Sequence, residues 1–166
     1  RTTSGNSVTA QLYKPILRKS SLPLATRMMT VAACVRSRIF HNAGTWSAIT
    51  RPQQERLDTA YMRPLRVIAG AHRPPTEAAP TRLSNEDVRK QLQVPTVRAI
   101  LDAAIMRYAL RALARAPDYL LALIQGPGGR QWRLDLACAV ATLRLLLAPR
   151  LDALPDPRTD LAPWEN

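Results

Sequence analysis

The sequence predicts an all-α protein: an irregular helical bundle with a loose N-terminal segment and an extended, proline-rich C-terminal tail. Apolar side chains recur at three- and four-residue spacings, which is the period of a buried helix face. Aromatic residues make up only 5% of the 166 residues, whereas the strands of sandwiches and barrels are rich in them. Prolines separate the periodic stretches and gather again near the C-terminus, where they exclude regular structure.

Periodic apolar faces with start and stop signals between them define the expected elements. Residues 1–23 are rich in Ser and Thr without apolar periodicity, so we expect them to be loose. Thr50 and Pro52 are typical of a helix start, and Gly70 of a helix end. Residues 149–166 form the predicted tail. The bundle of residues 24–148 is expected to hold helices at about 24–41, 51–69, 84–92, 96–116, 118–124 and 131–148.

Two of these expected helices carry unusual features. Pro64 falls in the apolar stripe of helix 51–69, well past the first turn. Because proline lacks an N–H group and its ring clashes with the preceding turn, at a cost of about 3 kcal/mol, we expect a kink or break near Arg63. Helix 96–116 has apolar residues on two opposite sides, which predicts that it lies at the centre of the bundle.

The charge of the chain is strongly basic and unevenly distributed. The chain has 24 Lys and Arg residues and 12 Asp and Glu residues, which gives a net charge of +12. Of the 24 cationic residues, 21 are arginines. Residues 1–50 hold seven cations and no acid, residues 51–115 hold twelve cations and six acids, and residues 116–166 hold five cations and six acids. A polyanion is therefore the first expected partner, contacted by the first two thirds of the chain.

Arginines on two of the expected helices are the candidate phosphate contacts. Arg56, Arg63 and Arg66 gather opposite the apolar stripe of helix 51–69, where guanidinium groups would meet phosphates at successive turns. Arg107 and Arg111 on helix 96–116 complete the set. The alternative is a solvated basic face that only keeps the protein soluble. The remaining aromatic and thiol side chains are predicted as core residues: Trp46, Tyr61, Tyr108, Trp132, Cys34 and Cys138.

No catalytic, metal or cofactor site is predicted in this chain. The two histidines, His41 and His72, are interpreted as ordinary surface residues. The glycine-rich stretch 126–129 lacks the Lys-Ser/Thr ending of a phosphate-binding loop and is interpreted as a linker. No apolar run reaches the roughly 18 residues of a membrane span. An enzyme acting through a site that the sequence does not reveal stays open.

Several short motifs follow one another between about residues 24 and 115. They are Gly44-Thr45-Trp46, Tyr61-Met62-Arg63-Pro64-Leu65-Arg66-Val67-Ile68-Ala69-Gly70, Ser84-Asn85-Glu86-Asp87-Val88-Arg89, Leu92-Gln93-Val94-Pro95 and Arg107-Tyr108-Ala109-Leu110-Arg111. Each motif is short and unspecific, but their order and spacing resemble the region that follows the polymerase core in reverse transcriptases of non-LTR (LINE-type) retrotransposons.

The resemblance implies a thumb and post-thumb segment that holds template and primer, as RNA or an RNA–DNA duplex. The polymerase palm would be encoded upstream, since the family's metal-binding Asp-Asp motif has no counterpart here, and no catalytic residue is carried over. We therefore expect a fragment of an intracellular RNA-directed DNA polymerase, in the nucleus or the cytoplasm. Residues 40–46 and Pro64 depart from the sequence pattern of this family, so a decayed copy of the retrotransposon is a second interpretation. The alternative is a basic α-helical protein-interaction module without enzymatic activity.

Overall fold

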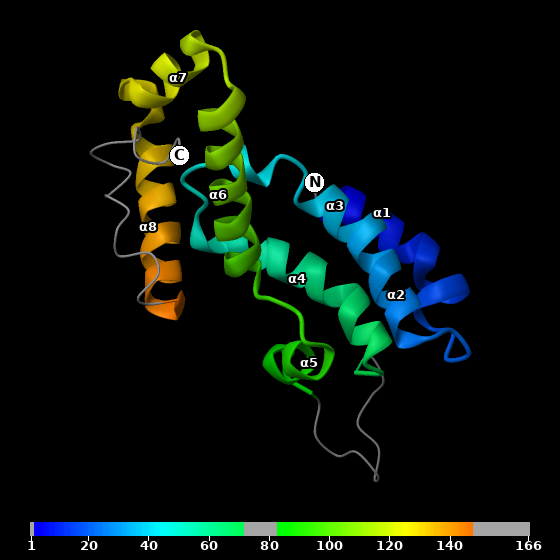
Figure 1. The fold of residues 1–166 in the computed structure, drawn as a ribbon. Coiled ribbons are helices and arrows are strands. Elements are labelled where there is room, and N and C mark those ends of the chain that lie inside the picture. The colour runs from blue at the N-terminus through cyan, green and yellow to red at the C-terminus, as the bar shows by residue number, and fades with distance from the viewer. Residues whose placement is uncertain (1, 72–82, 148–166) are drawn as a thin grey trace. The chain divides into compact units, whose positions relative to one another are not determined.

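All regular structure in the described residues is helical, as the sequence predicts. The computed structural model describes residues 2–71 and 83–147, and Figure 1 shows the course of the chain. The predicted all-α class is therefore confirmed. The tail expected at residues 149–166 lies outside the described residues.

The chain forms two compact units, and neither is a continuous stretch of sequence. Unit 1 combines Arg1–His41 with Arg51–Val97, and unit 2 combines Asn42–Thr50 with Arg98–Asn166. By sequence, unit 1 carries fifteen Lys and Arg against five Asp and Glu, a net charge of +10. Unit 2 carries nine against seven, a net charge of +2. The basic character of the protein therefore belongs almost entirely to unit 1.

The N-terminal segment is helical, so the prediction that residues 1–23 are loose is wrong. Helix α1 covers Thr2–Leu12 and continues directly into a π-helical turn, η1, at Tyr13–Leu17. The polar composition of α1 gives it only a weak apolar face, which explains why periodicity failed to predict it. Short helices of this kind depend on tertiary packing rather than on their own propensity.

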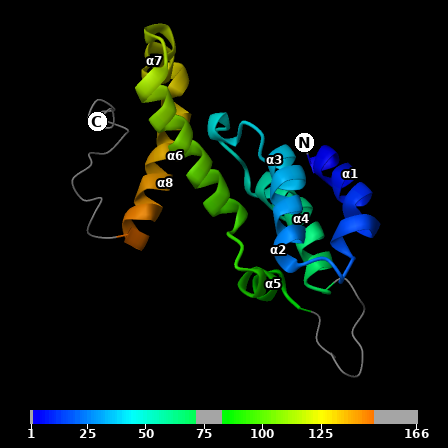
Figure 2. The same ribbon diagram turned by 45° about the vertical axis from the view of Figure 1, so that its right-hand side comes forward.

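Close packing against the third helical segment holds α1 in place. A Cβ atom built on Gly5 would clash with Cγ1 of Ile39, so the Ile39 side chain packs against the Gly5 backbone more closely than a side chain at position 5 allows. Val8 and Leu17 are buried along the same helical run. Figures 1 and 2 both show α1 beside the run of α2 and α3. Glycine at this position is therefore the residue that permits the contact.

A continuous helical run follows, close to the predicted range 24–41. It consists of α2 (Leu24–Thr30), the π-helical stretch η2 (Val31–Arg36) and α3 (Ser37–Ile39). Asn42 then adopts a left-handed conformation with φ of 55°. Asparagine tolerates this region better than most residues, which is the stop signal that the sequence indicates.

Helix α4, Arg51–Ile68, is the centre of unit 1. It contacts every other helical element of the unit: α1, η1, α2, η2, α3 and α5. Its inner face is fully buried at Met62, Pro64 and Leu65. The helix continues through Pro64, so of the predicted kink or break the break is wrong, and the kink stays a prediction. Burial of the proline ring in the core offsets the hydrogen bond that proline cannot make.

The fifth helix begins and ends with strong local signals. Helix α5 covers Asn85–Leu92, and Ser84 and Asp87 form a reciprocal capping box at its start. Gln93 ends it in the left-handed region with φ of 51°. The predicted helix 84–92 is therefore confirmed.

Unit 2 is built from two long antiparallel helices joined by shorter elements. Helix α6 (Val97–Arg115) is followed by α7 (Asp118–Gln125), a 3-10 turn (Pro127–Gly129) and α8 (Arg130–Leu147). Figures 1 and 2 show α7 at the end where α6 and α8 are joined. The predicted helices 96–116, 118–124 and 131–148 are confirmed to within a residue or two at each end.

Side chains of α6 and α8 form the core of this unit. The indole N–H of Trp132 donates a hydrogen bond to the carbonyl of Gly44 at 2.8 Å, and the ring meets Tyr108 edge to face at 5.7 Å. Burial of Trp132 confirms its predicted core role. The buried cluster consists of Ile105, Ala109, Trp132, Leu136 and Val140.

Two expectations for these helices are wrong. Leu110 lies in the second apolar strip of α6 but is 51% exposed, so the strip is not fully covered as a central helix requires. Cys138 is exposed on α8 rather than buried in the core. Both positions follow helical periodicity, which reports a face but not whether another element covers it.

Gly44 provides a test of the unit 2 packing. A Cβ at this position would lie 2.5 Å from Cβ of Tyr108 and 2.6 Å from the carbonyl oxygen of Ala104, so Gly44→Ala forces backbone to move. We expect it to lower the free energy of unfolding by about 1–3 kcal/mol. The measurement is denaturant unfolding followed by circular dichroism.

Gly128→Ala is the matched control, since nothing lies within 4 Å of the added methyl group. Its stability should stay within about 0.5 kcal/mol of the parent chain. Equal effects of the two substitutions would contradict this packing.

Candidate nucleic-acid interface

Two of the predicted arginines lie on one exposed face of α4. Arg56 and Arg63 are exposed and seven residues apart, so they stand two turns apart, within about 20° of each other around the axis and about 10.5 Å apart along it. Neither side chain forms an ion pair or hydrogen bond with another described residue. Their guanidinium groups are therefore available to an external anion.

Arg66 has a structural role instead. It is half-buried, and its two terminal nitrogens donate hydrogen bonds to Asn85 Oδ1 at 3.0 Å and to the carbonyl of Ala71 at 3.2 Å. The side chain thus connects the C-terminal end of α4 to the start of α5. Arg66 is therefore less accessible to a phosphate than Arg56 and Arg63, which are exposed.

A small polar network strengthens the same connection between α4 and α5. Asp58 accepts a hydrogen bond from Arg89, with which it forms a half-buried ion pair, and another from the Asn85 side-chain amide at 3.4 Å. Nearby, burial raises the pKa of Tyr61, while the positive charges of Arg36 and Arg89 act in the opposite direction. The phenol is buried and protonated at neutral pH, which confirms a core role for Tyr61.

The other two predicted arginines belong to unit 2. Arg107 and Arg111 are exposed one turn apart on α6. Arg107 donates from Nε to the carbonyl of Ala103 at 3.0 Å, within its own helix. Arg111 has no partner among the described residues. The structure therefore does not bring the five predicted residues together in one unit.

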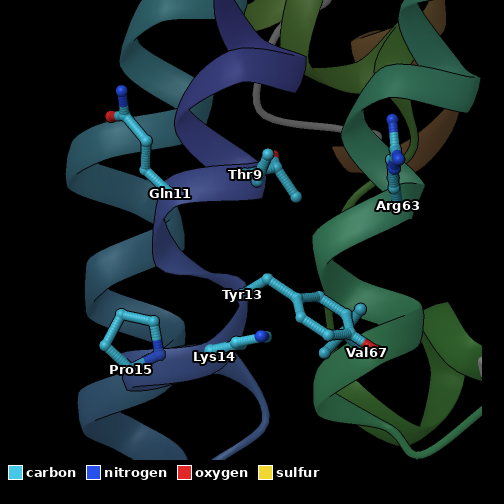
Figure 3. A pocket seen from close by; sticks show the side chains of 8 residues that line it. Thr9, Gln11, Tyr13, Lys14, Pro15, Arg63 and Val67 are labelled. Carbon is cyan, nitrogen blue, oxygen red and sulfur yellow. The ribbon is translucent and has the colours of Figure 1, made fainter.

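A cleft of about 520 Å³ lies between the N-terminal helical segment and α4, next to Arg63. In Figure 3 the Tyr13 ring extends from η1 toward Val67, and Arg63 stands one turn back along α4. Sequence analysis missed this cleft, because it treated the segment that holds Tyr13 and Lys14 as loose. The lining residues are Thr9, Ala10, Gln11, Tyr13, Lys14, Pro15, Arg63 and Val67.

The wide turn at η1 shapes the N-terminal wall of the cleft. Pro15 has no N–H group to donate to the preceding turn, and its ring would clash with the carbonyl four residues earlier in a regular α-helix. The chain widens there, and the N–H of Arg18 donates to the carbonyl of Tyr13, five residues back, at 3.0 Å. The turn buries Leu17 while Tyr13 and Lys14 line the cleft.

The cleft has cations on opposite walls and no acidic residue in its lining. Lys14 and Arg63 are both exposed, and neither forms an ion pair with another described residue. The hydroxyl of Thr9 is already engaged, because it donates to the carbonyl of Gly5 at 2.8 Å. This electrostatic arrangement suits an anionic ligand.

Comparison with known proteins gives no relative: no protein family, no curated protein and no solved structure matches this chain.

Other kinds of site find little support in the described parts of the chain. Among residues 2–71 and 83–147, no three His, Cys, Asp or Glu side chains come together as metal ligands would. None of the helices in those ranges combines the length and the apolar character that a bilayer crossing demands.

Arg66 and Arg56 allow the structural and binding roles to be separated. Arg66→Ala removes two hydrogen bonds between α4 and its neighbours, and we expect it to lower the free energy of unfolding by about 1–2 kcal/mol. Arg56→Ala should change it by less than about 0.5 kcal/mol. The measurement is the denaturant midpoint of each variant, and a larger loss from Arg56→Ala would contradict the assignment.

Proposed function

We propose that this chain is a non-catalytic helical segment that holds nucleic acid through arginine–phosphate contacts, as part of a LINE-type reverse transcriptase. The observation that carries the proposal is the pair Arg56 and Arg63, exposed on one face of α4 without a partner among the described residues. Bond formation would be the task of a polymerase palm in another part of the parent polypeptide.

The geometry of this pair fits a nucleic-acid backbone. The axial separation of about 10.5 Å between the two positions follows from the helical rise. Phosphates repeat every few ångströms along a nucleic-acid strand, so the two arginines can contact different phosphates of one strand. The planar guanidinium fork binds phosphate oxygens in a bidentate manner, which favours arginine over lysine at such contacts.

The charge distribution supports the same function. Unit 1 has a net charge of +10, whereas unit 2 has +2. A concentrated positive field increases the rate at which a polyanion arrives and supplies sequence-independent affinity. Nucleic acid would therefore be attracted mainly to unit 1, where Arg56 and Arg63 lie.

The resemblance of residues 24–115 gives this binding a place in a larger reaction. In the family that it resembles, this region lies beyond the polymerase core and holds the template and primer. A segment of that kind needs phosphate contacts but no acid, base or metal ligand of its own. The parent protein would be an RNA-directed DNA polymerase, and the bound species RNA or an RNA–DNA duplex.

A protein-interaction module is the second candidate function, and one observation favours it. Unit 2 has a net charge of only +2, and it exposes several large apolar side chains. Exposed apolar surface is a common mark of a protein-binding site. The side chains are Leu110, Tyr119, Leu123 and Leu145.

Salt dependence and a matched pair of double variants test the proposed function. We expect the full chain to bind an RNA–DNA duplex with an affinity that falls steeply as salt rises, since each neutralised phosphate releases counterions. R56A/R63A should reduce the slope of log K against log salt by about 1.8, which is about 0.9 for each lost phosphate contact. Fluorescence anisotropy at several salt concentrations measures both quantities.

The control R51A/R130A also removes two positive charges from exposed positions, but Arg51 is already paired with Glu55 at 3.1 Å and Arg130 lies in unit 2. It should change the slope much less. Equal losses in the two double variants would point to net charge rather than to the α4 face. Absent binding, or binding that salt does not weaken, would contradict the proposal itself.

A further inference from the structure

The cleft beside Arg63 differs in shape and lining from the open face of α4. It has two walls, one from α1 and η1 and one from α4, and encloses about 520 Å³. Its lining combines two cations, one aromatic ring and apolar surface from Pro15 and Val67. A convex face can touch a backbone from one side only, whereas a two-walled cleft can enclose part of a ligand.

We propose that this cleft binds one unpaired nucleotide of a single-stranded nucleic acid. Lys14 and Arg63 hold its phosphate, and the ring of Tyr13 provides the surface on which the base stacks. The proposal deepens the proposed function and rests on it, because it assigns a particular form of nucleic acid to one part of the basic unit.

The volume of the cleft favours a single nucleotide over a duplex as the ligand. Pockets for small molecules are commonly about 300–1,000 Å³, so a cleft of about 520 Å³ suits a ligand made of one base, one sugar and one phosphate. A duplex is a wide rod with its bases turned inward and its phosphates outside. It can reach the rim of the cleft at Arg63 but cannot place a base inside.

The two cations suit the phosphates of a strand because they line the cleft from two different helical elements. Lys14 comes from η1 and Arg63 from α4, and both are exposed without an ion pair to another described residue. No Asp or Glu lines the cleft to compete with the ligand. An ammonium group and a guanidinium fork each give a phosphate charge-assisted hydrogen bonds.

Tyr13 supplies the part of the site that recognises a base. It is half-buried on the η1 side of the cleft, and in Figure 3 its ring extends toward Val67. Stacking on an aromatic side chain requires a base that is free of its partner strand, and it tolerates any base because every base has a π-face. The other aromatic residue of unit 1 in α4, Tyr61, is buried and cannot take this role.

The test compares a short single-stranded oligothymidylate with an RNA–DNA duplex, each titrated against the full chain by fluorescence anisotropy. Tyr13→Leu removes the ring and should weaken single-strand binding by about 5- to 150-fold, the range expected for one stacked base. Duplex binding should change less than twofold. Tyr13→Phe keeps the ring and should bind the single strand as the parent chain does.

Lysine variants provide a second measurement that does not depend on the partly buried ring. Lys14→Ala should weaken single-strand binding more than Lys19→Ala, although both remove one exposed positive charge from the same segment. Only Lys14 lines the cleft. Thermal unfolding of each variant by circular dichroism verifies that all of them fold.

Three outcomes would overturn the proposal: unchanged single-strand binding by Tyr13→Leu, equal losses on single strand and duplex, or equal effects of the two lysine variants. If duplex binding still depends on Arg56 in those cases, the cleft proposal fails while the proposed function stands. Absence of binding to both nucleic acids defeats the two together. Displacement of the oligothymidylate by micromolar thymidine monophosphate would assign the cleft to free nucleotides instead.

Discussion

Burial of one face of α4 is the constraint on which unit 1 depends. Every other helical element of the unit packs against this helix, and Leu65 at its centre is completely inaccessible to solvent. A helix enclosed in this way has one side left for charged residues, because an unpaired charge inside the core would cost far more than the core gains. The exposure of Arg56 and Arg63 is thus a consequence of the packing of the apolar side.

The basic composition overstates the number of cations that are free to bind. Arg66 supports the junction of α4 and α5, and in unit 2 Arg133 donates to the carbonyls of Ile124, Gln125 and Gly126, where it holds the turn after α7. Sequence placed Arg66 correctly on the outer side of its helix. It could not show Asn85 as its partner, since 19 residues separate the two and only the folded chain brings them together. The same limit hid Tyr13 and Lys14, whose role needs a second wall from α4.

Local signals predicted most helices well because they act within a few residues of each boundary. Ser84 caps α5 and Gly70 ends the run of α4 with φ of 73°, as each residue's own chemistry indicates. Two features that depend on distant contacts escaped prediction. Gly5 lets α1 pack closely against Ile39, and the ring of Pro64 is enclosed by the core. Periodicity and capping report local preference, and tertiary packing overrides it at such positions.

The nine residues 42–50 lie between α3 and α4 in sequence but belong to unit 2. There the carbonyl of Gly44 accepts the Trp132 indole N–H, and the N–H of Ala48 donates to Asp135 at 2.9 Å. A single recombination breakpoint therefore cannot divide the gene into two segments that each encode one intact unit. A truncation that removes the C-terminal helices therefore also leaves residues 42–50 of the remaining chain without the side chains that hold them.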